Sequence, residues 1–450
     1  MAKKDIDLTQ GSIPKHILRM LGPFWLAIVA LMSAGVVDTI YLGHLSTNAL
    51  AAVGFCFPII FFGNSVNIGL GAGTLSAISR AIGRKDRPLA KAHGASAVLL
   101  TLSVMTGICL LSFLVMSRVL DIMGITAEIK PLALSYLKYG LPALIVMGLA
   151  MITNNVLRSG GEALLPSFIM ISGAILNIII DPFLIFGIGP FPRMEVQGAA
   201  LATLLANGLA AGFGLFIIFF YRRVASFAGL SLRRVVTSWK TILRVGFPAI
   251  GTNVIVPVAG LMTTAIVARN LGTIEVAAFT IVGRVGMLAL TMLYALSACI
   301  GAVTGQNGGA GLTDRVRETF VFCFKICFAW GAFIGVVLGL TATLIPQAFT
   351  KDAAVVAAAA PYFWIVPVTF AGYGAVFVAA AGFNALGRPS YGLVMTIIRS
   401  MFMFVPFIWL GVHFYGMVGA YLGMAAANIL SGAIALYFTL KKAPMQAVHH

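Results

Sequence analysis

The sequence predicts an all-α integral membrane protein, with twelve transmembrane helices in two six-helix lobes related by a pseudo-twofold axis along the membrane normal. Composition is the first reason: 60% of the 450 residues are hydrophobic and 10% are charged, whereas about 25% of a soluble domain is charged. The mean hydropathy of +1.01 is too high for one globular core to hide these residues. The other two reasons are the recurrence of long apolar stretches and a repeat between the two halves.

Apolar stretches long enough to cross a hydrocarbon core of about 30 Å recur along the whole chain. Several are longer than the roughly 20 residues that a span needs, which indicates helices that tilt or extend beyond the bilayer. Short turns containing Gly, Pro or charged residues separate them. The twelve expected spans are 17–43, 49–79, 92–117, 130–157, 163–187, 196–221, 241–268, 275–304, 316–345, 353–384, 390–413 and 416–440.

Basic residues are distributed unevenly between the two sides of these spans. Of the 30 Lys and Arg residues, 21 fall on one side, 5 on the other and 4 within spans. Because cytoplasmic loops carry the excess of Lys and Arg, we expect both termini in the cytoplasm and the chain in the cell (inner or plasma) membrane. Orientation also accounts for the net charge of +17, so we expect no nucleic-acid partner.

The two halves repeat at a shift of about 225 positions. Pro23 corresponds to Pro248, and Pro142 corresponds to Pro367. Six spans per half is an even number, so the halves share one orientation, which is the parallel type of transporter repeat. The expected domains are an N-terminal lobe at 1–221, a basic cytoplasmic linker at 222–240 and a C-terminal lobe at 241–450.

Two acidic side chains, Asp38 and Asp181, lie deep within apolar stretches. An ionisable side chain at bilayer depth costs several kcal/mol, so such residues usually face a cavity and mark an ion or substrate path. Neither acid recurs in the second half, because Asp38 aligns with Thr263 and Asp181 with Val405 or Ile408. A driving ion is therefore expected to bind in the N-terminal lobe.

Further oxygen donors accompany these acids. Asn177 precedes Asp181 by four residues and thus shares its helix face. Pro182 lacks an N–H, which leaves a backbone oxygen of its helix without a partner. Thr203, which aligns with Met424 in the second half, lies on the next span. Such a set suits Na⁺, but two close, buried carboxyls also favour one shared proton, and the sequence does not decide between the two ions. The proposed ligands are Asp38, Asn177, Asp181 and Thr203.

Other polar residues within spans have structural interpretations. A polar side chain in a membrane helix can hydrogen-bond to a neighbouring helix, for about 0.6 kcal/mol on average, and we prefer this for Asn207 and Asn428, which occupy matching positions in the two halves. Of the four basic residues within spans, Arg284 is expected to be the one that lies deep. The others, expected to snorkel or to pair near span ends, are Lys138, Lys325 and Arg399.

Small side chains also have structural interpretations. The five cysteines lie in apolar stretches without Cys-x-x-Cys spacing, so we expect buried thiols, with no disulfide or zinc site. Glycines at four-residue spacing indicate close helix packing. These glycines are Gly331, Gly335 and Gly339 in one span, and Gly208 and Gly212 in another.

Taken together, these patterns resemble the multidrug and toxic compound extrusion (MATE) family of cation-coupled antiporters. The resemblance covers essentially the whole chain and is closest to the branch of archaeal and DNA-damage-inducible-type bacterial members. In the other bacterial branch the coupling acids lie in the second half, whereas spans seven and ten here contain no internal Asp or Glu. The motifs that carry the resemblance are Val37-Asp38-Thr39, Gly43-His44-Leu45, 49–54, 157–161, Gly305-Gln306-Asn307 and 384–387.

The resemblance implies a function and site residues. It implies a secondary active antiporter, not an enzyme, that exports amphipathic, largely cationic organic compounds in exchange for H⁺ or Na⁺. It implies no cofactor, a monomer, and small organic cations or amphipathic drugs and membrane lipids as partners. The matching cation-site residues would be Asp38, Asn177, Asp181 and Thr203, with Tyr136 tied to the site's hydrogen bonding. Pro23 matches the position where span one bends, and the substrate cavity would contain Asn154, Met170 and Pro23.

Three other functions are less well supported by the sequence. A lipid or lipid-linked-sugar flippase of the same superfamily often has extra spans and a cationic cavity, whereas this sequence has twelve spans and acidic candidates. An intramembrane aspartyl protease uses two aspartates as an acid–base dyad, but neither Asp38 nor Asp181 stands in a Gly-x-Gly-Asp context. A passive channel is disfavoured because the span ends carry no rings of charge.

Overall fold

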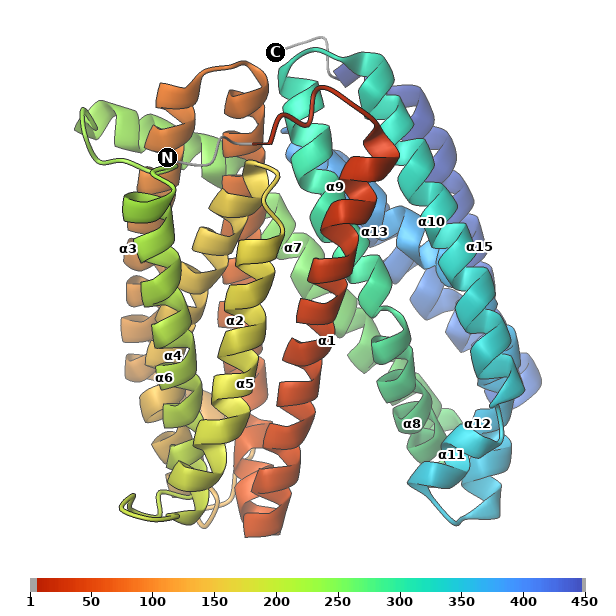
Figure 1. Cartoon of the computed structure of the whole chain (residues 1–450). Helices are drawn as coiled ribbons and strands as arrows, with labels where there is room; N and C mark the ends of the chain where they lie inside the picture. Colours follow the sequence, from red (N-terminus) through yellow and green to blue (C-terminus); the bar gives the residue numbers. More distant parts are fainter. Residues whose placement is uncertain (1–5, 447–450) are drawn as a thin grey trace. The chain divides into compact units, whose positions relative to one another are not determined.

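The computed structural model describes residues 6–446, and helix is the only regular secondary structure in this range (Figure 1). The first half contains six long helices and ends in a short π-helix. They are α1 (Ile13–Leu45), α2 (Thr47–Gly83), α3 (Arg87–Ile122), α4 (Lys130–Ser159), α5 (Leu164–Phe186), α6 (Val196–Phe216) and η1 (Ile217–Tyr221).

The second half is divided into more pieces, because several of its helices are interrupted. Its α-helices are α7 (Leu232–Asn270), α8 (Thr273–Ala289), α9 (Thr291–Gly309), α10 (Thr313–Leu340), α11 (Leu344–Phe349), α12 (Ala353–Ile365), α13 (Phe370–Ala385), α14 (Pro389–Ile397) and α15 (Val405–Gln446). A 3₁₀ turn, η2 (Pro367–Thr369), joins α12 to α13, and a π-helix, η3 (Ile398–Phe404), joins α14 to α15.

The described helices provide the predicted twelve crossings. Eleven helical runs are long and apolar enough to span a membrane, and the last of them, Pro389–Ala443, is 55 residues long. This run reverses at Tyr415 and Gly416, whose backbone angles are not helical. The chain after the turn packs back on the chain before it, because Gly419 lies against the backbone of Gly411. The all-α, twelve-span fold class is thus confirmed.

The chain divides into two compact units whose boundaries differ from the expected domains. Of the described residues, the first unit contains Ile6, Asp7 and Gly22–Ile250, and the second contains Leu8–Leu21 and 251–446. The expected linker at 222–240 belongs to the first unit, and its second part, from Leu232, lies in α7 and packs on α3. There the indole Nε1 of Trp239 donates to the carbonyl of Ser96 at 2.9 Å.

The N-terminal segment joins the second unit through buried amide side chains. Gln306 accepts a hydrogen bond from the backbone N–H of Leu8 at 3.0 Å, and the Nδ2 of Asn307 donates to the Leu8 carbonyl at 3.1 Å. The guanidinium of Arg315 donates to the carbonyls of Leu8 and Gly11. The Gly305-Gln306-Asn307 motif therefore anchors the start of the chain.

Each unit is built around one central helix, in agreement with the predicted repeat. In the first unit α4 packs against α2, α3 and α6, and in the second unit α13 packs against α9, α10 and α15. Both are the fourth crossing of their half. The matching prolines lie on these two crossings, Pro142 inside α4 and Pro367 in the turn before α13.

The glycine prediction is confirmed for one span and wrong for the other. A Cβ at Gly331 or Gly335 of α10 would approach the backbone of Ala371 or Val368 at about 3 Å, so these glycines do allow close packing. A Cβ at Gly208 or Gly212 of α6 would meet no atom within 4 Å. Four-residue spacing therefore did not identify the packed face of α6.

The hairpin inside α15 depends on the absence of a side chain at Gly419. Because a Cβ there would collide with the Gly411 carbonyl, we expect Gly419→Val to destabilise the protein by about 3 kcal/mol, the upper range for overpacking. Thermal unfolding of the detergent-purified protein measures this as a lowered Tm. Gly212→Val is the matched control and should leave Tm unchanged, so equal Tm values for the two variants would contradict the hairpin packing.

Candidate functional site

The two membrane acids lie together in the first unit. Asp38 comes from α1 and Asp181 from α5, and their carboxyl groups are within hydrogen-bonding reach of each other. The Asp181 side chain is fully buried. Asp38 Oδ1 and Asp181 Oδ2 are buried without a donor among the described residues. A hydrogen bond between them needs one carboxyl to be protonated, because an ionised carboxylate can only accept.

Two of the other predicted cation-site residues adjoin this acid pair. The Nδ2 of Asn177 donates to Asp181 Oδ1 at 3.3 Å, one helical turn away on α5. The phenol of Tyr136 on α4 is within electrostatic range of both carboxyls. The acid pair, Asn177 and Tyr136 thus come from three helices to one place.

Thr203 has a different described contact. Its hydroxyl donates to the carbonyl of Ala199 in its own helix at 3.1 Å. The packing of α6 on α5 nevertheless places it at a similar depth to the acid pair, because Gly198 meets Leu184 near one end of the contact and Ala210 meets Gly173 near the other. The role of Thr203 as a ligand of the site therefore stays a prediction, which this hydrogen bond does not oppose, because a hydroxyl that donates keeps its oxygen lone pairs.

The residues that the resemblance assigned to a substrate cavity are spread over three helices. Pro23 lies inside α1, Asn154 on α4 and Met170 on α5, and all three are partly buried. The Oδ1 of Asn154 is buried without a described partner. Within the part of the chain that the structure describes, no hydrogen bond joins these three side chains to one another.

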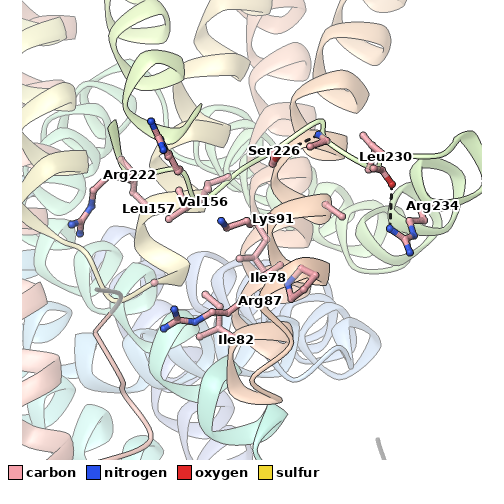
Figure 2. A pocket seen from close by; sticks show the side chains of 18 of the residues that line it. Ile78, Ile82, Arg87, Lys91, Val156, Leu157, Arg222, Ser226, Leu230 and Arg234 are labelled. Atoms are coloured by element: carbon pink, nitrogen blue, oxygen red, sulfur yellow. Dashed lines mark hydrogen bonds between the residues drawn. The ribbon is translucent and has the colours of Figure 1, made fainter. Parts of the chain in front are cut away.

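A cavity of about 730 Å³ in the first unit lies at the start of α3 and beside the segment that precedes α7. Its wall carries five basic side chains and one acid, Glu162, which forms a buried ion pair with Arg222. The guanidinium of Arg234 donates to the carbonyl of Gly229 at 3.1 Å. We call this cavity the basic cavity. Figure 2 labels four of its basic side chains, Arg87, Lys91, Arg222 and Arg234. None of the acid-pair residues lines it.

The second unit contains a smaller cavity, of about 250 Å³, with Arg399 in its wall. We call it the arginine cavity. Arg399 is 6% exposed, whereas Arg284 is exposed on the surface of its unit, so the depth of Arg284 in the membrane stays a prediction. The guanidinium stacks over Tyr373, 4.2 Å from the ring centroid, and donates to Asn428 Oδ1 at 3.2 Å.

Arg399 is the candidate that sequence reasoning missed. A signal for it was present: the acids of the second-half spans, Glu275 and Glu318, stand at the span starts, so an arginine deep within a span there has no nearby carboxylate in the sequence with which to pair. The burial of Arg399 could not be predicted from the sequence, because this residue lies in the π-helix η3, where the helical periodicity is broken.

Comparison with known proteins decides the family. The MatE family model matches residues 23–183 and 248–410, once in each half, and the two matches begin at the prolines that the repeat pairs. The chain belongs to the MATE family. The double match also confirms the repeat.

Other MATE-related proteins resemble this chain over nearly its whole length. A protein of Shewanella oneidensis described as an FAD transporter is 30% identical over 438 residues, covering 97% of this chain and 96% of the relative. A probable multidrug resistance protein, NorM, of Thermotoga maritima is 26% identical and covers 95% of this chain and 92% of the relative. The crystal structure of the Vibrio cholerae MATE transporter VcmN in its bent form is 26% identical, covers 97% of this chain and 98% of that one, and has a TM-score of 0.91. This MATE protein is therefore a multi-pass membrane transporter.

The acid pair and the buried ion pair of this MATE protein should respond differently when one charge is removed. Two adjacent carboxylates without a cation destabilise the fold, so Asp181→Asn should give a Tm at pH 7 that equals or exceeds that of the wild type. Glu162→Gln instead breaks a buried ion pair, which costs about 3 kcal/mol, and should lower Tm. A lower Tm for Asp181→Asn than for Glu162→Gln, measured in detergent without added Na⁺, would mean that the acid pair stabilises the structure.

Proposed function

We propose that this protein is a secondary active antiporter that exports amphipathic, largely cationic organic compounds in exchange for H⁺ or Na⁺. In this proposal it acts as a monomer in the inner or plasma membrane, with both termini in the cytoplasm, because that orientation places most Lys and Arg residues inside. The observation that carries the proposal is the acid pair of Asp38 and Asp181 in one buried site.

The acid pair supports ion coupling through its unfilled hydrogen-bonding capacity. Both carboxyls present buried oxygens without a protein donor, and no Lys or Arg forms an ion pair with either of them among the described residues. A proton or a Na⁺ satisfies these oxygens and removes the repulsion between the two charges. Asn177 adds an amide oxygen to the set once its side-chain amide turns over, so that Oδ1 faces the site in place of the Nδ2 that now donates to Asp181, as hard cations favour oxygen ligands.

Ion binding drives export only if it favours one conformation over another. An ion shifts a conformational equilibrium by its differential affinity for the two states and by nothing else. In the proposed cycle, an ion entering from outside binds the acid pair, α1 bends near Pro23, and the affinity for the exported compound falls. Opening to the cytoplasm then releases the ion. Pro23 suits a bend because it removes one hydrogen bond from the interior of α1.

The proposed role of Asp38 predicts a specific loss of transport. Asp38→Asn keeps the size of the side chain but removes the charge that an ion discharges, so efflux of a cationic dye from proteoliposomes should fall to the rate without protein. Asp121→Asn is the matched control, because Asp121 is an exposed acid paired with Lys130, and it should transport normally. Both variants should be expressed and folded. Dye efflux by Asp38→Asn at the wild-type rate would refute the assignment.

The same assay identifies the coupling ion. Efflux is measured under an inward Na⁺ gradient at equal pH, and then under an inward proton gradient without Na⁺. A Na⁺ site predicts efflux in the first condition, and a shared-proton site predicts efflux in the second. Efflux that is independent of both gradients would exclude ion-coupled antiport and favour the flippase alternative.

A second candidate substrate class comes from the Shewanella oneidensis relative. That protein is described as an FAD transporter and is 30% identical to this chain, whereas the Thermotoga maritima relative is described as a probable multidrug resistance protein and is 26% identical. FAD is an anionic, aromatic dinucleotide. Export of such a compound by the same antiport mechanism is therefore the alternative to export of organic cations.

A further inference from the structure

The arginine cavity contains a positive charge without a carboxylate partner. The second unit has four acids among the described residues, Glu275, Asp314, Glu318 and Asp352, and three of them lie in the first turn or at the N-cap of a helix. No ion pair joins any of them to Arg399. A cation buried at membrane depth without a counter-ion is costly and usually functional.

The groups around Arg399 hold the guanidinium but do not neutralise it. Two aromatic rings contact it, Tyr373 at 4.2 Å and Phe404 at 5.3 Å from the ring centroids. Its Nη2 donates to Asn428 Oδ1, and Asn428 is fixed in turn by donating to the hydroxyl of Thr369 at 3.1 Å. Its Nε–H has no partner, and neither has the hydroxyl of the adjacent Ser400. Two unused donors therefore lie beside the charge in the wall of the cavity.

The repeat between the two halves relates the arginine cavity to the proposed cation site of the first unit. Its wall contains Thr263 and Met424, which align with Asp38 and Thr203 of the proposed cation site. It also contains Tyr362, which lies 226 positions after Tyr136, within one residue of the shift between Pro142 and Pro367. The second unit thus has a cavity at the place of the acid pair, with the charge reversed.

We propose that the arginine cavity binds an anionic group, phosphate or carboxylate, carried by a transported compound. The guanidinium and the Ser400 hydroxyl supply donors to the anion, and the aromatic and Met side chains of the wall contact the apolar part of the compound. The proposal relies on the proposed function only in treating the bound compound as cargo. It adds a substrate feature, because a compound that carries an anionic group on an aromatic body fits this cavity.

Binding of two flavins to the purified protein tests this. Riboflavin and FMN share the same ring system and differ by one phosphate, and quenching of flavin fluorescence gives Kd for each in nanodiscs of zwitterionic lipid. We expect the wild type to bind FMN at least about tenfold more tightly than riboflavin, and Arg399→Gln to abolish that preference. Arg399→Lys should keep part of it. Lys325→Gln, which removes an exposed charge from α10, is the matched control and should behave as the wild type.

Several results would overturn the proposal. Equal binding of FMN and riboflavin by the wild type would do so without any variant. A preference that persists in folded Arg399→Gln would show that the phosphate binds elsewhere, for example in the basic cavity. Anionic lipid that co-purifies with the wild type and not with Arg399→Gln, together with no preference for FMN, would make a lipid headgroup the occupant.

The binding test is independent of ion coupling. Asp38→Asn is expected to keep the preference for FMN, because its substitution lies in the first unit. Failed efflux with an intact Arg399-dependent preference would refute the antiport proposal alone. Ion-driven efflux of a cationic dye without any preference for FMN would refute the anion site alone.

Discussion

The cost of an unsatisfied charge at membrane depth is the constraint on which the rest of this structure depends. Where a charge is buried for structural reasons, it has a partner, as Arg222 has in Glu162. Within residues 6–446, the acid pair of Asp38 and Asp181 has no cationic partner, and Arg399 has no anionic one. Because lipid supplies neither water nor counter-ions to such groups, their partners have to come from outside the protein. We therefore propose ion and cargo binding at the unpaired charges, and a structural role for the paired charge at the basic cavity.

The fold class and the acid pair could be predicted because both depend on signals that are local in the sequence. Span number follows from the length of apolar stretches, and the parallel repeat follows from an even number of spans with matching residues such as Pro23 and Pro248. The two acids were conspicuous because an acid within a long apolar stretch is rare for energetic reasons. The place of Asn177 beside Asp181 could be predicted because residues four apart lie on the same face of a helix. Their convergence from α1 and α5 was a hypothesis that only the tertiary structure could test, and the structure places the carboxyls together.

The incorrect predictions concerned features that depend on neighbours in space. Arg399 was expected to snorkel or to pair near a span end, yet its side chain is buried within the second unit, in the π-helix η3. Gly208 and Gly212 have the same spacing as Gly331 and Gly335, but a Cβ at either position would meet no atom within 4 Å. The assignment of Leu8–Leu21 to the second compact unit depends on Gln306 and Asn307, about 300 positions away. None of these partners is visible in the local sequence.

The repeat explains how one scaffold can provide two sites of opposite charge. Two halves with the same helix order place corresponding residues in corresponding positions, so Asp38 and Thr263 occupy equivalent places with different chemistry. In the proposed exchange, the ion binds in the first unit and the anionic group of the cargo binds in the second. The effect of ion binding then has to reach the second unit through helices that belong to both units. Only α1 and α7 divide their residues between the two units. On α1 the division falls between Leu21 and Gly22, next to Pro23, where the helix lacks a backbone hydrogen bond. A bend there is the least costly way for discharge of Asp38 to affect the second unit, because it leaves the packing within each unit intact.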